Sequence, residues 1–425
     1  MSKSKMSSKQ SKCKNVDVLV IGGGLSGGTL SLALAQAGFD VATVDREDMA
    51  GWTDRGFDGR ASAIALSSQR VLAGVGIWDV IGAETAPMLD IRVSDGHSPL
   101  FLHYDHEELG TPGADPEPFG YMVENRSIRK ALNVLVPKTK NLTYFAPNQV
   151  ESLERDAEGV HAVLQDGTQI EARLVVACEG RQSPTRDAAG IGLTKWDYKQ
   201  AGIVCTVEHE HPHNFCAQER FLPSGPFAIL PLVGSAEKPG CRSSIVWTER
   251  ADLWPIIMDL DDEDFLEELE VRFGDFLGEI EIVGPKFAYP FSLQFAHSYT
   301  AERLALVADS AHGMHPIAGQ GLNMGLRDVA ALAEVLVDAR RAGQDIGAPQ
   351  TLENYGRWRR FDNNLMLGVT DALVKLFSND IEPIQLARDL GMAAVNQMPN
   401  LKRFFMRHAM GTVGELPRLM RKEPL

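Results

Sequence analysis

The sequence LALVADSAHGMHPIAGQGLNMGLRD, at Leu304–Asp328, decides the fold of this chain. Its first residues, Leu304–Ala308, form a short apolar run typical of a buried strand, and Asp309 ends that run. Small, polar and turn-forming residues follow, and apolar residues then recur at helical spacing from Leu322 to Leu336. The pattern predicts a strand, a loop and a helix that begins near Gly321, with a carboxylate at the end of the strand.

This arrangement suits a flavin. A carboxylate at a strand end accepts hydrogen bonds from polyol hydroxyls, and glycines let backbone N–H groups approach a flat ring. The N-terminus of a helix carries partial positive charge, which stabilises the anion that a flavin ring becomes on reduction. Taken alone, the same stretch also suits a glycine-rich turn that binds nothing.

A second motif lies near the start of the chain. The apolar run Val16–Ile21 is followed by Gly22, Gly24 and Gly27 in the pattern G-x-G-x-x-G, then by a helical segment and a second strand that ends at Asp45. These glycines permit a tight turn and close approach of a pyrophosphate, and Asp45 is placed to bind ribose hydroxyls. The pattern predicts one permanently bound dinucleotide. Since it occurs once, a nicotinamide has to bind without a Rossmann domain of its own.

Composition excludes several classes of protein. The chain has 425 residues and a formal net charge of −15, which argues against nucleic acid as a partner. Its five cysteines contain no C-x-x-C pair, so we expect no disulfide framework and no metal site. No apolar run approaches the roughly 20 residues that span a bilayer. Residues 1–14 lack the apolar core of a secretory signal and are predicted to be a disordered tail of a cytoplasmic protein.

Other segments leave alternatives open. Residues 103–120 are predicted to be a long exposed loop. Arg60 and Arg129 suit either the cofactor or ordinary surface pairing. Beyond Pro399, basic residues interleave with Phe404, Phe405 and methionines. This pattern indicates docking to an anionic membrane surface or an acidic partner, or a terminal helix that folds back on the protein.

Together these motifs resemble those of the flavin-dependent aromatic hydroxylases, the class A monooxygenases with the p-hydroxybenzoate hydroxylase fold. Within them the chain is similar to the ubiquinone-biosynthesis hydroxylases, from about Val16 to Gly411. The resemblance is carried by Gly22–Gly27, by Cys178–Arg186 and by Ala308–Asp328, where the run H-P-I-A-G-Q-G-x-N-x-G-x-x-D is intact from His315. In the middle motif Glu179 replaces the family aspartate, which supports flavin and nicotinamide binding.

The resemblance implies an α/β fold, with a Rossmann-like FAD-binding domain, a second domain on a mostly antiparallel sheet, and C-terminal helices. We expect the FAD-binding domain to comprise residues 15–95, 121–194 and 290–345. The substrate-binding sheet would comprise residues 96–120 and 195–289, and the C-terminal helical region residues 346–425. The predicted FAD-binding residues are Gly22, Gly24, Gly27, Asp45, Arg46, Arg60, Arg129, Asp309, Pro316, Gly319, Gln320, Gly321 and Asn323.

The implied reaction is hydroxylation of a polyprenylated phenol in ubiquinone biosynthesis. FAD is reduced by NADH or NADPH, O2 adds to give a flavin C4a-hydroperoxide, and one oxygen passes to the ring. The protein positions the reactants and excludes water. His312 and His315 are the nearby candidates for a base, but both also suit a structural role, and no catalytic residue is assigned. The basic C-terminus would contact the membrane surface or other proteins of ubiquinone biosynthesis, placing the protein on the inner face of the cytoplasmic membrane.

Three other functions remain open at this stage. A hydroxylase of a small soluble aromatic predicts a carboxylate-binding arginine in the sheet, with Arg220 and Arg242 as candidates. A flavin reductase of prenyl double bonds predicts no oxygen-dependent hydroxylation. A flavin-bearing subunit with little turnover of its own is suggested by Glu179 and predicts bound FAD with negligible NAD(P)H oxidation.

Overall fold

A parallel sheet forms the centre of the larger domain. The computed structural model describes residues 13–425 except 50, 52–59, 97, 99, 111–114, 316–318, 378–387 and 389–390. The sheet has the strand order β18-β19-β11-β1-β2-β8, with β10 beside β11 and β9 beside β10. Its strands are β1 (Cys13–Ile21), β2 (Val41–Val44), β8 (Leu142–Phe145), β9 (Val150–Arg155), β10 (Val160–Leu164), β11 (Gln169–Ala177), β18 (Thr300–Ala301) and β19 (Leu304–Leu306).

The central strands are continuous apolar runs because helices bury them on both faces. Residues of β1, β2, β11 and β19 share one core with α1, α5 and α9, and α1 packs against both of the other two helices. The helices of this domain are α1 (Leu25–Gln36), α3 (Leu66–Gly74), α4 (Ile77–Ile81), α5 (Asn125–Leu135), α6 (Pro184–Ala188) and α9 (Gly321–Arg341).

The second domain is built on a nine-stranded sheet with the order β20-β17-β12-β15-β14-β13-β5-β6 and β16 beside β12. Every pairing is antiparallel except that of β13 with β5, which agrees with the expected mostly antiparallel sheet. The strands are β5 (Asp90–Asp95), β6 (Phe101–Asp105), β12 (Leu193–His209), β13 (Cys216–Leu222), β14 (Gly225–Leu232), β15 (Arg242–Arg250), β16 (Ile280–Ile282), β17 (Phe287–Ala296) and β20 (His312–Gly313).

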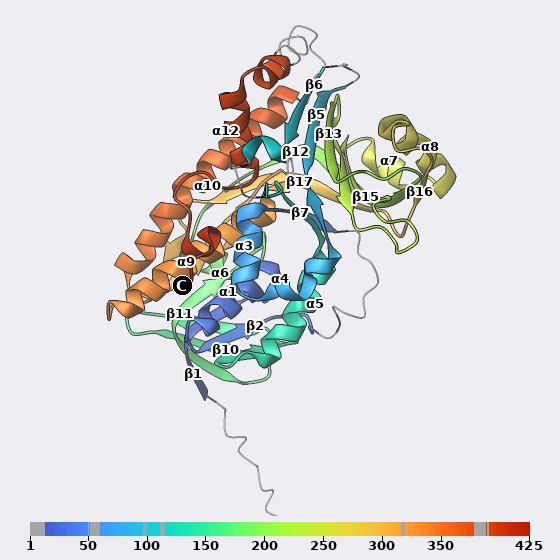
Figure 1. Ribbon diagram of the computed structural model, residues 1–425. Coiled ribbons are helices and arrows are strands. Elements are labelled where there is room, and N and C mark those ends of the chain that lie inside the picture. The colour runs from blue at the N-terminus through green and yellow to red at the C-terminus, as the bar shows by residue number, and fades with distance from the viewer. Residues whose placement is uncertain are drawn as a thin grey trace, which may run out of the picture.

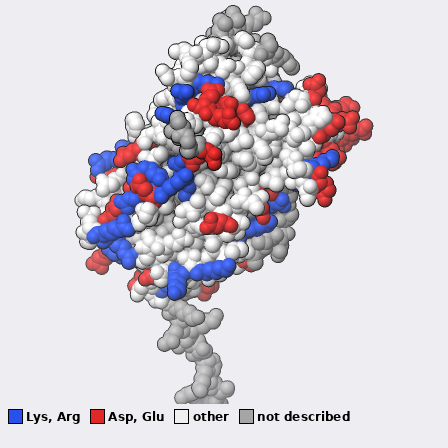
Figure 2. All heavy atoms as spheres, in the orientation of Figure 1, with Lys and Arg blue, Asp and Glu red and all other residues white. Residues whose placement is uncertain are grey.

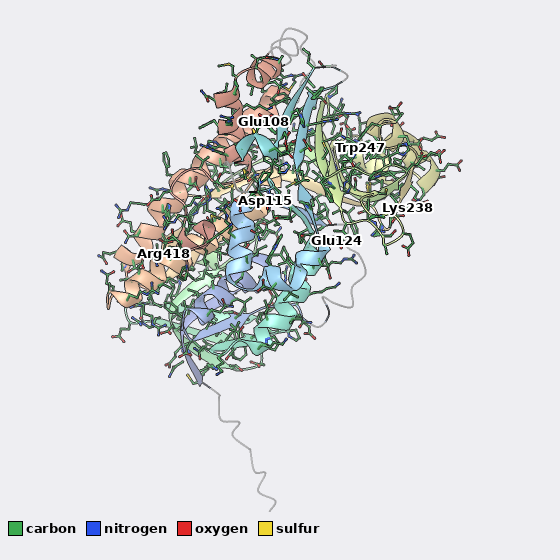
Figure 3. All side chains as sticks on the ribbon, viewed as in Figure 1. Glu108, Asp115, Glu124, Lys238, Trp247 and Arg418 are labelled. Atoms are coloured by element: carbon green, nitrogen blue, oxygen red, sulfur yellow. The ribbon has the colours of Figure 1, made fainter. Side chains whose placement is uncertain are left out.

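The two faces of this sheet have different neighbours. Helices α7 (Trp254–Met258) and α8 (Asp262–Phe273) cover the outer face, where Ile203, Phe227 and Trp247 form a core with Phe265 of α8. Figure 3 shows the labelled Trp247 on that side. The opposite, inner face turns toward the larger domain and the C-terminal helices (Figure 1).

Strand pairing sets several boundaries in this part of the fold. Helix α3 begins at Leu66, because residues 61–65 form β3 (Ala61–Ala65), which pairs with β7 (Gly120–Glu124) beside β4 (Thr85–Met88). Part of the loop expected at 103–120 belongs to β6 and to a 3-10 turn at His106–Leu109. At the N-terminus, Cys13 and Lys14 lie in β1 and pair with Gln169 and Ile170.

The C-terminal region packs against the larger domain. Helix α10 (Pro349–Phe377) lies along α9, and α12 (Pro399–Ala409) buries Met406 against the three-stranded sheet. The last residues return to α9, where the backbone N–H of Arg418 donates to Glu334 and its guanidinium pairs with Asp338. Met420 is fully buried there. Figure 1 shows α10 and α12 on one side of the molecule, far from α7 and α8.

Candidate active site

The turn after β1 leaves space where a ligand would lie. Gly22 has a φ of +96°, and a Cβ there would come within 2.4 Å of the Cys178 carbonyl oxygen, so the protein itself requires glycine. A Cβ on Gly27 would come within 1.9 Å of the Gly22 oxygen. Gly24, the residue before α1, has an ordinary φ of −63° and no atom within 4 Å of its Cβ position. Its empty surroundings are what close approach of a pyrophosphate needs.

Asp45 lies beside this turn. One of its carboxylate oxygens accepts from the Gly23 N–H at 2.6 Å, and the other accepts from the Glu47 N–H at 2.8 Å. The hydroxyl of Tyr144 donates to the Gly23 oxygen, and burial together with Asp45 raises the pKa of that hydroxyl. Asp45 is therefore fixed next to the glycine turn, as a ribose-binding acid would be, whereas Arg46 is exposed.

The second carboxylate, Asp309, is exposed although it follows the buried strand β19 and precedes the buried Ser310. Within the part of the chain that the structure describes, its carboxylate has no hydrogen-bond or ion-pair partner. Ala308, the residue before Asp309, adopts a φ of +56°. This left-handed backbone turns the chain sharply at the strand end and costs an L-residue about 1–2 kcal/mol.

The helix that begins at Gly321 meets the first helix at this point. A Cβ on Gly325 would come within 2.8 Å of the Ala308 Cβ and 3.0 Å of the Ser26 hydroxyl, so the first turns of α9 and α1 are packed together. Gly321 itself has no atom within 4 Å of its Cβ position. Two helix N-termini with their partial positive charge, two carboxylates and open backbone therefore share one site, as a bound dinucleotide requires.

The remaining residues predicted to bind FAD differ in whether their polar groups are already used within the protein. The Asn323 amide is committed to the protein: its oxygen accepts from the Ala65 N–H, and its nitrogen donates to the carbonyls of Ala63 and Gly319. Its side chain therefore holds the loop against β3. Gly319 has a φ of +62°, and Gln320 directly precedes α9. Pro316 lies outside the described residues.

Arg60 and Arg129 lie in the same region. The Arg60 carbonyl accepts from the N–H of Asn125, the first residue of α5, and α5 carries Arg129. Both side chains are partly exposed and both have interactions within the protein. Their assignment to the cofactor stays a prediction.

The middle motif, residues 178–186, contacts the loop before α9 and helps to hold it in place. Glu179 accepts from the Ser183 hydroxyl at 2.6 Å and from the Thr185 N–H at 3.2 Å, so it anchors the start of α6. Arg181, a residue of this motif without a predicted role, donates to the carbonyls of Ser292 and Met314. The position of Arg181 within the middle motif was the one sequence feature that could have indicated a role. The residues that it contacts lie more than 100 positions later in the chain.

A buried ionic network around Asp328 contacts the same loop through Ala308 and His312. Asp328 accepts from the Ala308 N–H at 3.0 Å, lies 2.6 Å from His312 Nε2, and accepts from Arg359 Nε at 2.7 Å. Burial alone would raise the pKa of Asp328, but His312 and Arg359 hold it well below its usual range. Arg359, fully buried on α10, also pairs with Asp362 and Asn363. Arg359 belongs to none of the three sequence motifs, so the pattern of the sequence does not mark it.

The two histidines of the loop occupy different environments. His312 is committed to Asp328 inside this network. His315 is fully buried, and its ring lies edge-on against Phe291 and Tyr198, with centroid distances of 4.5 and 5.0 Å. Burial lowers the pKa of His315 to about 4, so it is neutral at pH 7 and a weak base. A structural role suits both.

The inner face of the second sheet faces this site. Val204, Val246 and Ala228 form one row across β12, β15 and β14, and all three stay partly exposed in mid-sheet. Phe221 of β13 stacks on Phe377 of α10 at 4.0 Å between centroids. The middle of this face is therefore apolar, and the row continues to the partly exposed Glu219 on β13.

The two arginines proposed for a soluble substrate are engaged elsewhere. Arg220 donates to the Arg272 carbonyl on α8, on the outer side of the sheet. Arg242 forms an ion pair with Glu208. Neither presents an uncompensated guanidinium to the inner face.

Comparison with known proteins settles the family. The family described as "FAD binding domain" matches residues 15–361. The chain belongs to the FAD-dependent ubiquinone-biosynthesis hydroxylases. It is 55% identical to the ubiquinone hydroxylase UbiL of Rhodospirillum rubrum, over 97% of this chain and 94% of that protein. It is 32% identical to the 3-demethoxyubiquinol 3-hydroxylase of Escherichia coli, over 93% and 98%.

A solved structure supports the same fold. The p-nitrophenol 4-monooxygenase PnpA of Pseudomonas putida superposes with a TM-score of 0.77, at 19% identity, over 95% of this chain and all of that one. The expected fold class and family are thus confirmed. The chain is an FAD-dependent aromatic monooxygenase, and NAD(P)H is the reductant typical of its family.

FAD fits the residues present. The open surroundings of Gly24 and Gly321 and the exposed Asp309 are features that an unliganded turn does not need. FAD supplies the oxygen-activating redox chemistry. In this site Asp45 and Asp309 would hold its hydroxyls, the two helix starts would hold its phosphates and ring edge, and the apolar sheet face would exclude water from the substrate side.

Proposed function

We propose that this hydroxylase acts on the ring of a polyprenylated phenol in ubiquinone biosynthesis. The observation that carries the proposal is the apolar row Val204, Val246 and Ala228 on the inner face, while Arg220 and Arg242 are both engaged by other groups of the protein. A soluble aromatic acid would need a cation to bind its carboxylate. A phenol with a hydrocarbon tail needs apolar surface instead, and burying that tail is favourable at about 25 cal/mol per Å².

The proposal is tested by lipid mass spectrometry on cells that lack the gene. A prenylated phenol one oxygen short should accumulate, and the ring position that lacks oxygen identifies the carbon. Expression of the wild-type chain under 18O2 should restore the quinone with one labelled oxygen at that carbon. An unchanged quinone profile would contradict the proposal and favour a soluble aromatic substrate.

We further propose that the protein meets its substrate at a membrane surface, through α10 and α12. Apolar side chains are exposed on both helices: Phe361 (76%), Leu365 and Val369 recur every four residues on α10, and Phe404 and Phe405 lie on α12. A patch of this kind is typical of a membrane or protein contact. Among the described residues, no helix is both long and apolar enough to cross a bilayer.

Charge contributes less to this contact than the sequence indicates. Four of the six basic residues beyond Pro399 form ion pairs within the protein, namely Lys402 with Glu108, Arg418 with Asp338, Arg421 with Glu423 and Lys422 with Glu117. Arg403 and Arg407 are exposed beside the two phenylalanines. Figure 2 shows a mixture of charged and uncharged surface over this side of the molecule.

Replacing Phe404 and Phe405 together by serine should lower the fraction of protein that floats with phosphatidylglycerol-containing vesicles by roughly threefold or more. The matched control is Ile256→Ser, since Ile256 is 61% exposed on α7, far from the patch. Equal flotation of the double variant and the wild-type protein would contradict membrane contact. If neither the wild-type protein nor the double variant floats with vesicles, and a copurifying protein covers the patch, a protein partner would be favoured.

A further inference from the structure

A cavity lies where β12, β17 and the middle motif meet, and Arg181 in its wall contacts the loop that carries Met314. Its volume is about 500 Å³, within the range of roughly 300–1,000 Å³ typical of small-molecule sites. The walls come from the first half of β12, from residues 290–294 of β17 and from the middle motif. None of the predicted FAD-binding residues lines it.

The lining is cationic on an acidic protein. Arg181, Lys195 and Lys199 line the cavity, against one carboxylate, Asp197. Arg181 donates to neutral oxygens of Ser292 and Met314, and in the described part of the chain it has no carboxylate partner. Lys195 lies 3.9 Å from Asp197, at the limit of an ion pair, and both are exposed. The cavity therefore carries a positive charge that the protein leaves largely uncompensated.

Lys199 reaches the cavity from a bulge in β12. The pairing of β12 with β17 shifts register between Asp197 and Ala201, and Lys199 within the bulge has a φ of +55°. Bulges re-aim side chains next to binding sites. Within the described residues, the Lys199 ammonium has no carboxylate or hydrogen-bond partner, and its carbonyl accepts from the Ala251 N–H.

Residues in the wall of the cavity also contact the loop before α9, at Gly313, Met314 and His315. Arg181 binds the Met314 carbonyl, and a Cβ on Gly313 would come within 3.0 Å of its guanidinium. Phe291, which lines the cavity, contacts the His315 ring. Trp254 adds an aromatic wall on which a flat base can stack.

We propose that this cavity binds the pyrophosphate and one base of the nicotinamide dinucleotide that reduces the flavin. This dinucleotide is the anion that the reaction consumes, and the chain holds no second Rossmann fingerprint for it. The reductant passes a hydride, two electrons with one proton, to the oxidised flavin and leaves as NAD(P)⁺ with its phosphates unchanged. The inference rests on NAD(P)H being the reductant, and it is independent of which phenol is hydroxylated.

The test is anaerobic stopped-flow reduction of the FAD-loaded enzyme by NADH and by NADPH. Changing Lys195 and Lys199 together to glutamate should raise the apparent Kd of the preferred dinucleotide by about tenfold or more, because two attractive charges become repulsive. The limiting reduction rate should stay within about twofold, since the flavin environment is unchanged, and raising the ionic strength should weaken wild-type binding. Lys238→Glu is the matched control: this lysine, labelled in Figure 3, is exposed on a loop of the same domain and does not line the cavity.

Two outcomes would overturn the proposal. One is an apparent Kd of the double variant within twofold of wild type for both dinucleotides, and the other is an equal rise in Lys238→Glu. Single turnover after chemical reduction with dithionite separates this proposal from the substrate assignment. The double variant reduced in this way should hydroxylate a prenylated phenol as the wild-type enzyme does. If the reduced wild-type enzyme fails to hydroxylate the phenol, the proposed substrate is wrong, and the proposal for the dinucleotide site is unaffected.

Discussion

Replacing Arg359 by methionine should destabilise the protein by roughly 3–5 kcal/mol, a large part of the roughly 5–15 kcal/mol that stabilises a typical domain. The guanidinium is fully buried and holds Asp328, which is fully buried too. Methionine keeps the apolar stem of the side chain but has no guanidinium, so the Asp328 carboxylate would keep His312, the Ala308 N–H and the Asn363 amide as partners and lose its cation. Desolvation of that carboxylate would then be only partly offset.

Thermal and urea unfolding of the variant measure this effect. The control is Arg357→Met on the same helix, since Arg357 is 66% exposed and should change stability by less than about 0.5 kcal/mol. Adding Asp328→Asn to Arg359→Met should recover part of the loss, because the neutral amide needs no counter-charge. Equal stability of Arg359→Met and Arg357→Met would show that the network contributes little.

Replacing Gly24 by valine should remove the flavin and leave the fold intact. The Cβ position of Gly24 has no protein atom within 4 Å, and its φ of −63° suits any L-residue. The added methyl groups would occupy the space that the cofactor pyrophosphate needs. We expect FAD affinity to fall by at least about 100-fold, or about 2.7 kcal/mol.

Flavin absorbance per protein and FAD titration of the apoprotein measure the loss. Gly368→Val is the matched control, because Gly368 on α10 also has no atom within 4 Å of its Cβ position and lies far from the glycine turn in sequence. That variant should keep its flavin. Circular dichroism and unfolding of the apoprotein should be the same for Gly24→Val and wild type. Purification of Gly24→Val with full flavin occupancy would refute the placement of the pyrophosphate.

The sequence predicted the parts of the site that are local in the chain. Each of the two segments is a strand, a turn and a helix within a few residues, so hydrophobic period and turn chemistry were enough to put Gly24, Asp45, Asp309 and Gly321 at strand ends and helix starts. Their contacts with the cofactor stay a prediction. Partners far apart in sequence were not predicted. Strand β3 exists because residues 61–65 pair with β7, some 60 residues later, and nothing in its own pattern indicates this.

The same limit applies to side-chain roles. Asn323 fits the cofactor motif, yet its amide is used to hold β3, a role visible only once the two segments are brought together. Arg359 lies 31 residues after Asp328 in a charged helix where it resembles its exposed neighbours. Its burial depends on how α10 packs against α9, which amphipathic spacing alone does not specify.

The return of the last residues to α9 has a consequence for synthesis of the chain. Strand β1, made first, pairs with β11, which in turn pairs with β19 from the last third of the sequence. Helix α9 is then covered by Arg418 and Met420, and Arg418 lies 84 residues after its partner Glu334. A nascent chain therefore cannot complete its nucleotide-binding domain until Arg418 and Met420 have left the ribosome. Until then the domain should keep unfinished apolar surface that a chaperone can bind.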